Sequence, residues 1–334
     1  MAPPRSSPTV RVIIVNYNGL TCLPRCVEAL KAQAGIGWEC VLVDNGSTDG
    51  SLEEVRPLLD ARFRVIEAGE NLGFAAANNR GAEGAGTRWL ATLNPDAFAR
   101  EDWLANLVAG AEATGARMAG STQIQTEKPN FYDGLGDGYH ISGLAWRMGF
   151  GHLSPDVPDS PYPVFGPCAA AALYDRKLFE RVAGFDETFF CYHEDVDLAL
   201  RMRRAGATAV QVPDAIVDHV GSAITGRASE FAVFHGTRNR MWTFVTSMPL
   251  AGLILLGPLH IAMTLAMMVW SLFRPGRASP TWRGVLAGLH GLPARLAKRG
   301  EVSRDVGLWG LWPALTLNPV VAVRRTLSIA RERP

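Results

Sequence analysis

The feature that most constrains the fold of this chain is a regular alternation of two kinds of segment. From residue 10 to about residue 218, short runs rich in β-branched residues alternate with stretches whose apolar residues recur at helical spacing. Strands that alternate with helices build a parallel sheet, because each helix carries the chain back to the start of the next strand. The sequence therefore predicts an α/β fold, with a mostly parallel twisted sheet and flanking helices.

The first hundred residues contain the clearest predicted strands and helices. Leu23, Val27 and Leu30 lie three or four positions apart, which is the spacing of one face of a helix. Pro95 ends the fourth strand, because proline cannot donate a hydrogen bond to a neighbouring strand. The predicted strands are 10–16, 39–44, 63–67 and 89–93, and the predicted helices are 20–34, 52–59 and 73–84.

Composition divides the 334 residues into three parts. We expect a disordered tail at residues 1–9, one large α/β domain at 10–244 and a helical, membrane-associated region at 245–334. Within the α/β domain, glycine, proline and aromatic residues crowd into residues 123–163 without periodicity. This composition predicts a long irregular insertion of the kind that shapes a binding site.

Residues 250–273 are almost uncharged and are long enough to span a bilayer as a helix. We expect Gly257-Pro258 to break this stretch into two helices that lie in the plane of the membrane. Amphipathic segments at 282–296 and 309–329 add arginine and lysine for anionic headgroups. The alternative is an ordinary helical packing domain or a dimer interface, because helices rich in leucine, methionine and tryptophan also form protein cores.

Charge and cysteine content exclude several classes of protein. The chain has 33 lysine and arginine residues against 32 aspartate and glutamate, so no excess charge indicates nucleic acid as a partner. Five cysteines without a Cys-X-X-Cys pair indicate reduced thiols rather than a disulfide framework or a structural metal site. The first residues hold no apolar run long enough for a secretion signal, so we expect the catalytic part to stay in the cytoplasm.

Polar residues follow two neighbouring strands of the predicted sheet. Asn16 and Asp44 stand at the carboxyl ends of these strands, which is the edge where open α/β sheets bind ligands. Asp44 is suited to accept the ring N–H of a uracil or thymine base, and Gly46 lets backbone approach closely. The alternative is an ordinary cap between a strand and a helix.

Two further residues are candidate metal ligands. Asp96, in the sequence LNPDA, lies on a turn beyond a hydrophobic strand, where Mg²⁺ or Mn²⁺ could bridge the protein and a diphosphate. His219 follows a predicted strand at 208–212 and a turn at Pro213-Asp214. It is a candidate second ligand, although a lone histidine is more often structural.

Acidic residues crowd the first turn of a predicted helix that Gly206 ends. Acids at this place stabilise the helix dipole, and Asp197 is expected to pair with Arg201 one turn later. That explanation covers Asp197 but not the neighbouring Glu194 and Asp195. After a long glycine-rich loop, Asp195 is a candidate general base that deprotonates an acceptor hydroxyl.

Six motifs occur in an order that resembles one family of enzymes. Between residues 10 and 245 they read VNYNG, VDNGSTDGS, ENLGFAAANNRG, LNPDA, AGFDETFFCYHEDVDLALRMRRAG and VDHVGS. In these motifs the chain resembles the family 2 glycosyltransferases of the GT-A fold. Within that family it is most similar to the rhamnosyltransferase-like branch, which builds bacterial surface polysaccharides.

The resemblance implies roles for individual residues. It makes Asp195 the catalytic base, with Glu194 beside it. It also implies a Mn²⁺ or Mg²⁺ ion held by Asp96 and His219, although the metal motif reads Asn-Pro-Asp here instead of Asp-X-Asp. The residues that it assigns to nucleotide binding are Asn16, Asn18, Asp44, Asn79, Arg80 and Asn94.

The implied reaction is an inverting transfer of a sugar from a nucleotide donor to a polyprenyl-linked or polysaccharide acceptor, at the cytoplasmic face of the inner membrane. The first expected donor is dTDP-rhamnose, and UDP-hexoses or UDP-galactofuranose remain alternatives. A non-catalytic protein that binds nucleotide sugars or acts as a membrane scaffold also stays open, as does a homodimer. The acceptor side is expected within residues 134–167 and next to them, with Tyr139, His140, Trp146 and Cys168 as candidates.

Overall fold

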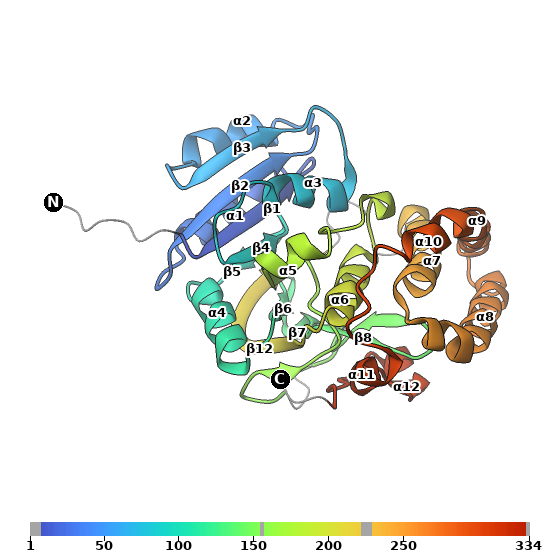
Figure 1. The fold of residues 1–334 in the computed structure, drawn as a ribbon. Helices are drawn as coiled ribbons and strands as arrows, with labels where there is room; N and C mark the ends of the chain where they lie inside the picture. Colours follow the sequence, from blue (N-terminus) through green and yellow to red (C-terminus); the bar gives the residue numbers. More distant parts are fainter. Residues whose placement is uncertain (1–7, 154–156, 222–228, 332–334) are drawn as a thin grey trace.

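The four strands predicted in the first hundred residues lie side by side and are all parallel, in the order β3-β2-β1-β4 (Figure 1). They are β1 (Val10–Asn16), β2 (Trp38–Asp44), β3 (Phe63–Glu67) and β4 (Trp89–Leu93). The computed structural model describes residues 8–153, 157–221 and 229–331, so most of the tail predicted at 1–9 lies outside the described residues.

The other half of the sheet mixes parallel and antiparallel strands. Here β11 (Ala171–Asp175) runs antiparallel between β4 and β6 (Met118–Gln125). Beyond β6 lies the parallel strand β12 (Ala209–His219), with which β5 (Ala97–Ala99) and β10 (Tyr162–Pro163) pair. The predicted α/β class with a twisted sheet and flanking helices is confirmed.

β12 corrects one prediction. The strand predicted at 208–212 does not end in a turn at Pro213, because the chain stays extended as far as His219. Its register against β6 shifts between Val212 and Ile216. Proline has no N–H for the ladder, and a bulge at that point removes the need for one. The longer strand carries His219 toward the candidate metal ligand Asp96.

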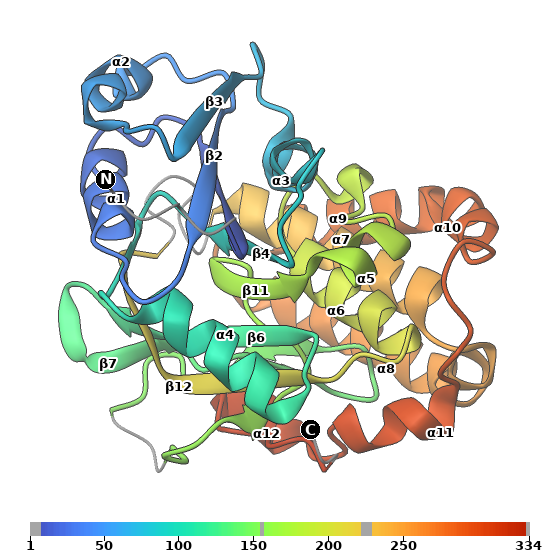
Figure 2. The same cartoon turned by 60° about the vertical axis from the view of Figure 1, so that its left-hand side comes forward.

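Helices cover both faces of the sheet. Neighbouring residues of β1 belong to different core clusters, with Val12 on one face and Ile13 on the other. The face of Val12 carries α1 (Leu23–Lys31), α2 (Ser51–Val55), the 3₁₀ helix η1 (Arg56–Leu58) and α4 (Trp103–Thr114), which crosses β6 and β12 in Figure 2. The face of Ile13 carries α3 (Gly73–Ala82), α5 (Arg176–Arg181) and α6 (Glu194–Arg204).

The insertion at 123–163 is more regular than predicted. β7 (Lys128–Gly134) pairs with β6, and β8 (Asp137–Tyr139) pairs with β9 (Ala145–Arg147). β8 and β9 are very short, and glycines in the left-handed conformation, such as Gly136 at φ +83°, separate the strands of the insertion. Such short strands leave too little periodicity for the sequence to reveal.

The C-terminal helices continue directly from the α/β domain. α7 (Glu230–Ser247) crosses the boundary predicted at 244/245 and packs against both α6 and α9 (Ala278–His290). In both views α8, α9 and α10 lie far from β3 and α2. The remaining elements are η2 (Glu187–Phe189), α8 (Leu250–Leu272), α10 (Leu292–Lys298), α11 (Leu308–Leu311), η3 (Trp312–Ala314) and α12 (Pro319–Arg324).

The break predicted at Gly257-Pro258 is wrong, since α8 is one continuous helix with Pro258 inside it. Proline removes one hydrogen bond of the helix ladder, but contacts on the inner face hold the next turns. His260 Nδ1 lies 2.8 Å from the carbonyl oxygen of Ser142, and Arg240 donates to Thr264 at 2.5 Å. Among the described residues, α8 is the one helix long and apolar enough to cross a membrane, and 22% of its most apolar window is buried.

Candidate active site

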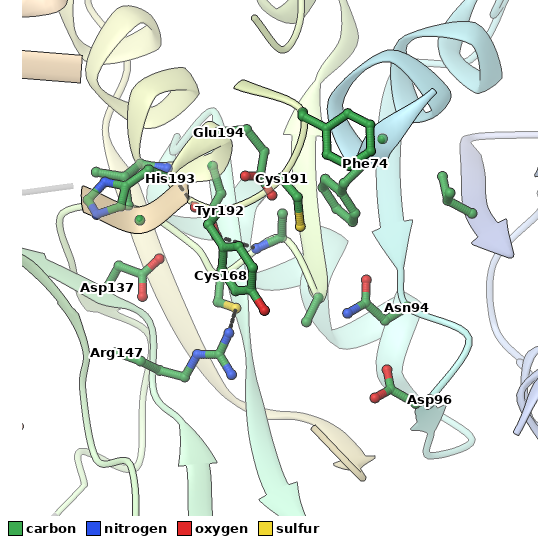
Figure 3. A pocket seen from close by; sticks show the side chains of 18 of the residues that line it. Phe74, Asn94, Asp96, Asp137, Arg147, Cys168, Cys191, Tyr192, His193 and Glu194 are labelled. Atoms are coloured by element: carbon green, nitrogen blue, oxygen red, sulfur yellow. Dashed lines mark hydrogen bonds between the residues drawn. The ribbon is translucent and has the colours of Figure 1, made fainter. Parts of the chain in front are cut away.

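A cavity of about 740 Å³ lies beyond the carboxyl ends of β1 and β4. Its walls come from the turn after β4, the start of α3, the loop before α6 and the insertion. In Figure 3, Asn94 and Asp96 lie on one side of the cavity, Asp137 and Arg147 lie on the other, and Glu194 is between them. This edge of the sheet is where open α/β folds bind their ligands.

The loop that leads into α6 has a strained backbone. Phe190, Tyr192 and His193 all have φ between +65° and +68°, a left-handed conformation that costs of order 1 kcal/mol for each such residue. Asn239 of α7 fixes the loop, because its amide nitrogen donates to three of the loop's carbonyl oxygens at 2.7–3.0 Å. The strain therefore sets the direction in which the first residues of α6 point. No sequence signal singled out Asn239, which lies inside a helix.

Asp195 lies at the start of α6 and lines the cavity. Its two carboxylate oxygens accept hydrogen bonds from the backbone N–H groups of Ala169, at 3.3 Å, and Val196, at 2.8 Å. Burial raises the pKa of Asp195, while these hydrogen bonds and the charge of Arg147 limit the rise. Burial and the neighbouring Asp195 raise the pKa of Glu194 well above its usual range. The chain thus holds an oriented carboxylate with enhanced basicity in the cavity.

Asp96 and His219 come together as the sequence predicted, although they are 123 positions apart. The distance from His219 Nε2 to Asp96 Oδ1 is 3.3 Å, and Nε2 is buried without a hydrogen-bond partner. The other ring nitrogen, Nδ1, lies 2.7 Å from Asp133 Oδ2. Burial alone would lower the pKa of His219, but the hydrogen bond with Asp133 and the negative charges of Asp133 and Asp96 outweigh it and raise the pKa.

Asn16 and Asp44 also come together, and they bond to each other. The Asn16 amide nitrogen donates to Asp44 Oδ1 at 3.0 Å, to Ser47 Oγ at 2.9 Å and to Ser51 Oγ at 2.8 Å. The backbone N–H of Ser47 donates to the other Asp44 oxygen at 3.1 Å. These bonds fold the turn after β2 into one shape, and neither Asn16 nor Asp44 is part of the cavity lining.

The other predicted nucleotide-binding residues lie in different places. Asn94 lines the cavity. The Asn18 side chain accepts a hydrogen bond from the turn after β2. Asn79 donates to the carbonyl of Phe185 at 2.9 Å and so ties α3 to the loop before α6, whereas Arg80 is exposed on α3. Of these four, the structure brings only Asn94 into the cavity lining.

The insertion supplies cavity residues that the sequence did not reveal. Arg147 donates to Asp133 Oδ2 at 2.8 Å and to Cys168 Sγ at 2.9 Å, the contact drawn in Figure 3. Asp137 lines the cavity beside them and is 6% exposed. Short strands carry all these residues except Cys168, so no motif spacing could have found them.

Only some of the predicted acceptor-side residues reach the cavity. Trp146 and Cys168 line it, and burial raises the pKa of the Cys168 thiol to about 12, so this cysteine stays protonated. Tyr139 and His140 are buried outside the lining. The prediction of Asp197 paired with Arg201 is confirmed, with an N–O distance of 2.6 Å.

An open α/β sheet with an oriented carboxylate and an Asp–His pair over one cavity defines a group-transfer enzyme that acts on a hydroxyl. The model of the family described as "Glycosyl transferase family 2" matches residues 11–183, just over half of the chain. The chain belongs to this family and is a glycosyltransferase. The matched segment includes Asp96 but ends before Asp195 and His219.

Two curated relatives illustrate the similarity. The succinoglycan biosynthesis protein ExoO of Rhizobium meliloti is 35% identical over 112 residues, which are 34% of this chain and 32% of that protein. The N-acetylglucosaminyl-diphospho-decaprenol L-rhamnosyltransferase of Mycobacterium tuberculosis is 29% identical over 248 residues, which are 67% of this chain and 80% of that protein. The similarity to ExoO thus spans only about a third of that protein's length.

Solved structures share the fold. GalNAc-T7 with UDP, GalNAc and Mn²⁺ matches with a TM-score of 0.57 and 18% identity, over 72% of this chain and 50% of that one. The mannosyltransferase PcManGT from Pyrobaculum calidifontis, in complex with GDP-Man and Mn²⁺, matches with a TM-score of 0.51 and 19% identity, over 96% of this chain and 79% of that one. At these identities the likeness concerns the fold alone.

Proposed function

We propose that this glycosyltransferase moves a sugar, with inversion, from a nucleotide donor to a lipid-linked or polysaccharide acceptor at the cytoplasmic face of the membrane. The observation that carries this proposal is the placement of Asp195. Backbone N–H groups hold its carboxylate at a helix start, in the same cavity as Asn94 and Asp96. A candidate base and the candidate diphosphate-binding residues therefore line the same cavity.

The reaction follows from this geometry. Asp195 takes the proton of an acceptor hydroxyl while that oxygen attacks the anomeric carbon. The bond from this carbon to the diphosphate oxygen breaks on the opposite side, which inverts the configuration. Glu194 lies beside Asp195, and burial together with the charge of Asp195 favours the protonated form of Glu194. We assign Asn16, Asn18 and Asp44 to the shape of the nucleoside site, and Asn94 to direct contact with the donor.

Asp96 and His219 fit a divalent cation such as Mn²⁺ or Mg²⁺. The bond with Asp133 favours the proton on His219 Nδ1, so in the neutral ring the Nε2 lone pair lies beside the Asp96 carboxylate. A bound cation would take the place of a proton on Nε2. The described residues contain no group of three or more histidine, cysteine or acidic ligands, and substrate phosphates usually complete such a site. A bound cation would neutralise the charge of the departing diphosphate.

The surface of α8 supports membrane attachment. Ile254, Ile261 and Leu265 recur on one face of the helix and are each 56–66% exposed. At its end, Arg274 lies over the ring of the half-exposed Trp270, the pairing of cation and aromatic ring that suits a headgroup layer. The opposite face is tied to the α/β domain through polar contacts. We therefore propose that α8 lies along the membrane surface and does not cross the bilayer.

The donor and the acceptor are proposed from the relatives. The mycobacterial relative is named as an L-rhamnosyltransferase that acts on a diphospho-decaprenol-linked sugar. We propose dTDP-rhamnose as the first donor to test, with UDP-glucose and UDP-galactofuranose as alternatives. An acceptor carried on a lipid agrees with the apolar face of α8, because such an acceptor moves in the membrane plane.

The first experiment is a donor and metal screen. Purified protein is incubated with each nucleotide sugar and Mn²⁺, Mg²⁺ or EDTA, and with prenyl-diphospho-N-acetylglucosamine as the acceptor probe. We expect one donor to turn over with a divalent cation, and the proton spectrum of the product to show an inverted anomeric centre. Failure of every nucleotide sugar to bind would contradict the proposal and favour a scaffold protein.

Membrane attachment has its own experiment. Vesicles of phosphatidylcholine with phosphatidylglycerol should sediment the protein, and Ile261→Ser combined with Leu265→Ser should reduce the bound fraction severalfold. Leu20→Ser is the control, because Leu20 is also exposed but lies before α1, far along the chain from α8. Equal sedimentation of all three proteins would argue against α8 as the membrane face.

A further inference from the structure

A fourth carboxyl group, Asp137, lines the cavity, and its side chain has no hydrogen-bond partner among the described residues. It is 94% buried, because its exposed fraction is 6%, and no group of the described residues donates a hydrogen bond to it. Glu194 also has an unpaired oxygen, Oε2, but that atom is sealed from solvent. The two Asp137 oxygens, in contrast, are not sealed from solvent. They open into the cavity. A carboxyl group that opens into the cavity and has no hydrogen-bond partner in the protein is available to a ligand.

The backbone fixes where this carboxyl group stands. The N–H of Asp137 donates to the carbonyl of Gly166 at 2.8 Å, and the Asp137 carbonyl accepts from Phe165 at 3.1 Å. On its other side Asp137 is paired in register with Arg147 of β9. The side chain is therefore held on a rigid strand, as a residue that recognises a ligand should be.

The protein groups nearest to Asp137 are engaged elsewhere. Arg147 directs its terminal nitrogens to Asp133 and Cys168 and acts on Asp137 through its charge alone. Asp195 has both oxygens bonded to backbone N–H groups. A proton shared directly between Asp137 and Asp195 would require a hydrogen bond between them, and the described residues contain none. Asp137 and Asp195 thus line the same cavity without bonding to each other.

The position of Asp137 points to the acceptor and not to the donor. Figure 3 shows it on the side of Arg147, across the cavity from Asn94 and Asp96. It is near enough to Asp195 for each carboxyl group to act on the other, since burial and the charge of Asp195 raise the pKa of Asp137. A carboxyl group that can hold a proton both donates and accepts, as a sugar hydroxyl does.

We infer that Asp137 binds the acceptor sugar through a free hydroxyl next to the one that Asp195 deprotonates. This inference rests on the proposed function, because it requires an acceptor in the cavity. It gives the acceptor a chemical class, a sugar with two neighbouring free hydroxyl groups. Asp195 reacts with one of these hydroxyls, and Asp137 sets the orientation through the other.

The test compares Asp137→Ala and Asp137→Asn with the unaltered protein. Transfer to prenyl-diphospho-N-acetylglucosamine and to a panel of free sugars is measured together with hydrolysis of the donor. We expect Asp137→Ala to raise the acceptor KM and to lower the ratio of transfer to hydrolysis, each at least about tenfold. Donor affinity should stay within about twofold, and Asp137→Asn, which keeps donor and acceptor atoms, should lose less.

Acceptors that lack one hydroxyl sharpen the test. The unaltered protein should lose about tenfold in transfer when the neighbouring hydroxyl is removed, and Asp137→Ala should lose almost nothing more. Asp175→Asn is the control, since Asp175 is a buried acid that caps α5 and pairs with Arg117 outside the cavity. An unchanged acceptor KM in both Asp137 variants, or a donor KM that rises as much, would overturn the inference. Absence of transfer by the unaltered protein would instead count against the proposed function.

Discussion

The two halves of the sheet differ in how their polar residues are hydrogen-bonded. At the end of β1 and β2, the Asn16 amide nitrogen bonds to Asp44 and to the serines of the next turn, whereas Asn16 Oδ1 is buried without a partner. Around the other half, His219 Nε2 and the carboxyl group of Asp137 have no hydrogen-bond partner among the described residues. Asn16 and Asp44 mainly hold a turn outside the cavity lining, whereas His219 and Asp137 line the cavity itself.

This difference indicates that the first half gives the nucleoside site its shape, whereas the second half takes part in the reaction. A turn whose polar groups are bonded to each other keeps one conformation, and it can hold a nucleoside without rearranging. Buried groups without partners are costly, and they are retained where a ligand or a reaction uses them. Changes in the first half should therefore raise the donor KM, and changes in the second half should affect kcat, the metal requirement or the acceptor KM.

The largest expected effect tests the second half. Asp195→Asn keeps the size of the side chain but removes the base, so kcat should fall about a thousandfold. The donor dissociation constant should change little, because Asp195 contacts the acceptor. Single-turnover transfer at saturating donor, together with a donor titration, measures both quantities.

The matched control for this variant is Asp197→Asn on the same helix. Asp197 is more deeply buried than Asp195, and it bonds to Arg201 at 2.6 Å and to the hydroxyl of Ser247 at 2.8 Å. Breaking this buried pair should lower the free energy of unfolding by about 3 kcal/mol and leave kcat nearly intact. A base assigned to the wrong residue would reveal itself if the two variants exchanged their effects.

The next effect concerns the Asp–His pair. His219→Ala removes one of the two proposed cation ligands, so the Mn²⁺ concentration for half-maximal activity should rise about 100-fold. Titration of the protein with Mn²⁺, followed by the loss of free-ion signal, measures the same change without catalysis. Unaltered activity in EDTA would contradict the metal assignment for the whole pair.

The same division explains which parts of the structure could be predicted from the sequence. β1 and β4 have the predicted bounds, because central parallel strands are continuous apolar runs between clear turn residues. The edge strand β3 also has its predicted bounds. The pairing of Asp96 with His219 was also predicted, but only through a family resemblance, since nothing local connects the two residues. The fold of the first half can thus be predicted from local sequence patterns.

The residues of the second half could not be predicted from local sequence patterns. Asp137 and Arg147 lie on strands of three residues, which are too short to show alternation. Asp133 lies on the longer β7, whose register against β6 is irregular. Asn239 reaches the loop before α6 from a helix that begins almost forty residues after that loop. The prediction at Pro258 failed for a similar reason, because distant contacts through Arg240 compensate for the local helix-breaking tendency.

A smaller effect is expected from the first half. Asn16→Ala removes three hydrogen bonds that shape the turn after β2, so the donor KM should rise about tenfold with kcat within twofold. Steady-state kinetics at varied donor concentration separate the two constants. Asn79→Ala is the comparison, because its bonds to Phe185 predict a loss of stability with little change in donor KM. If Asn16→Ala lowered kcat and left KM alone, the division between the halves would be broken.

The smallest effect is a change in pH dependence. Asp195 must be ionised to act as a base, so activity falls as the pH drops through its pKa, which burial raises above the ordinary value. The positive charge of Arg147 favours the ionised form and holds that pKa down. Arg147→Gln removes the charge, so the pKa should rise and the acid limb of kcat/KM should move to higher pH, whereas Arg147→Lys should move it less. Because the effect works through protonation of Asp195, the part of the loss that depends on pH should vanish at high pH. A uniform loss at every pH would mean that Arg147 serves the cavity through its bond to Asp133 and not through its charge.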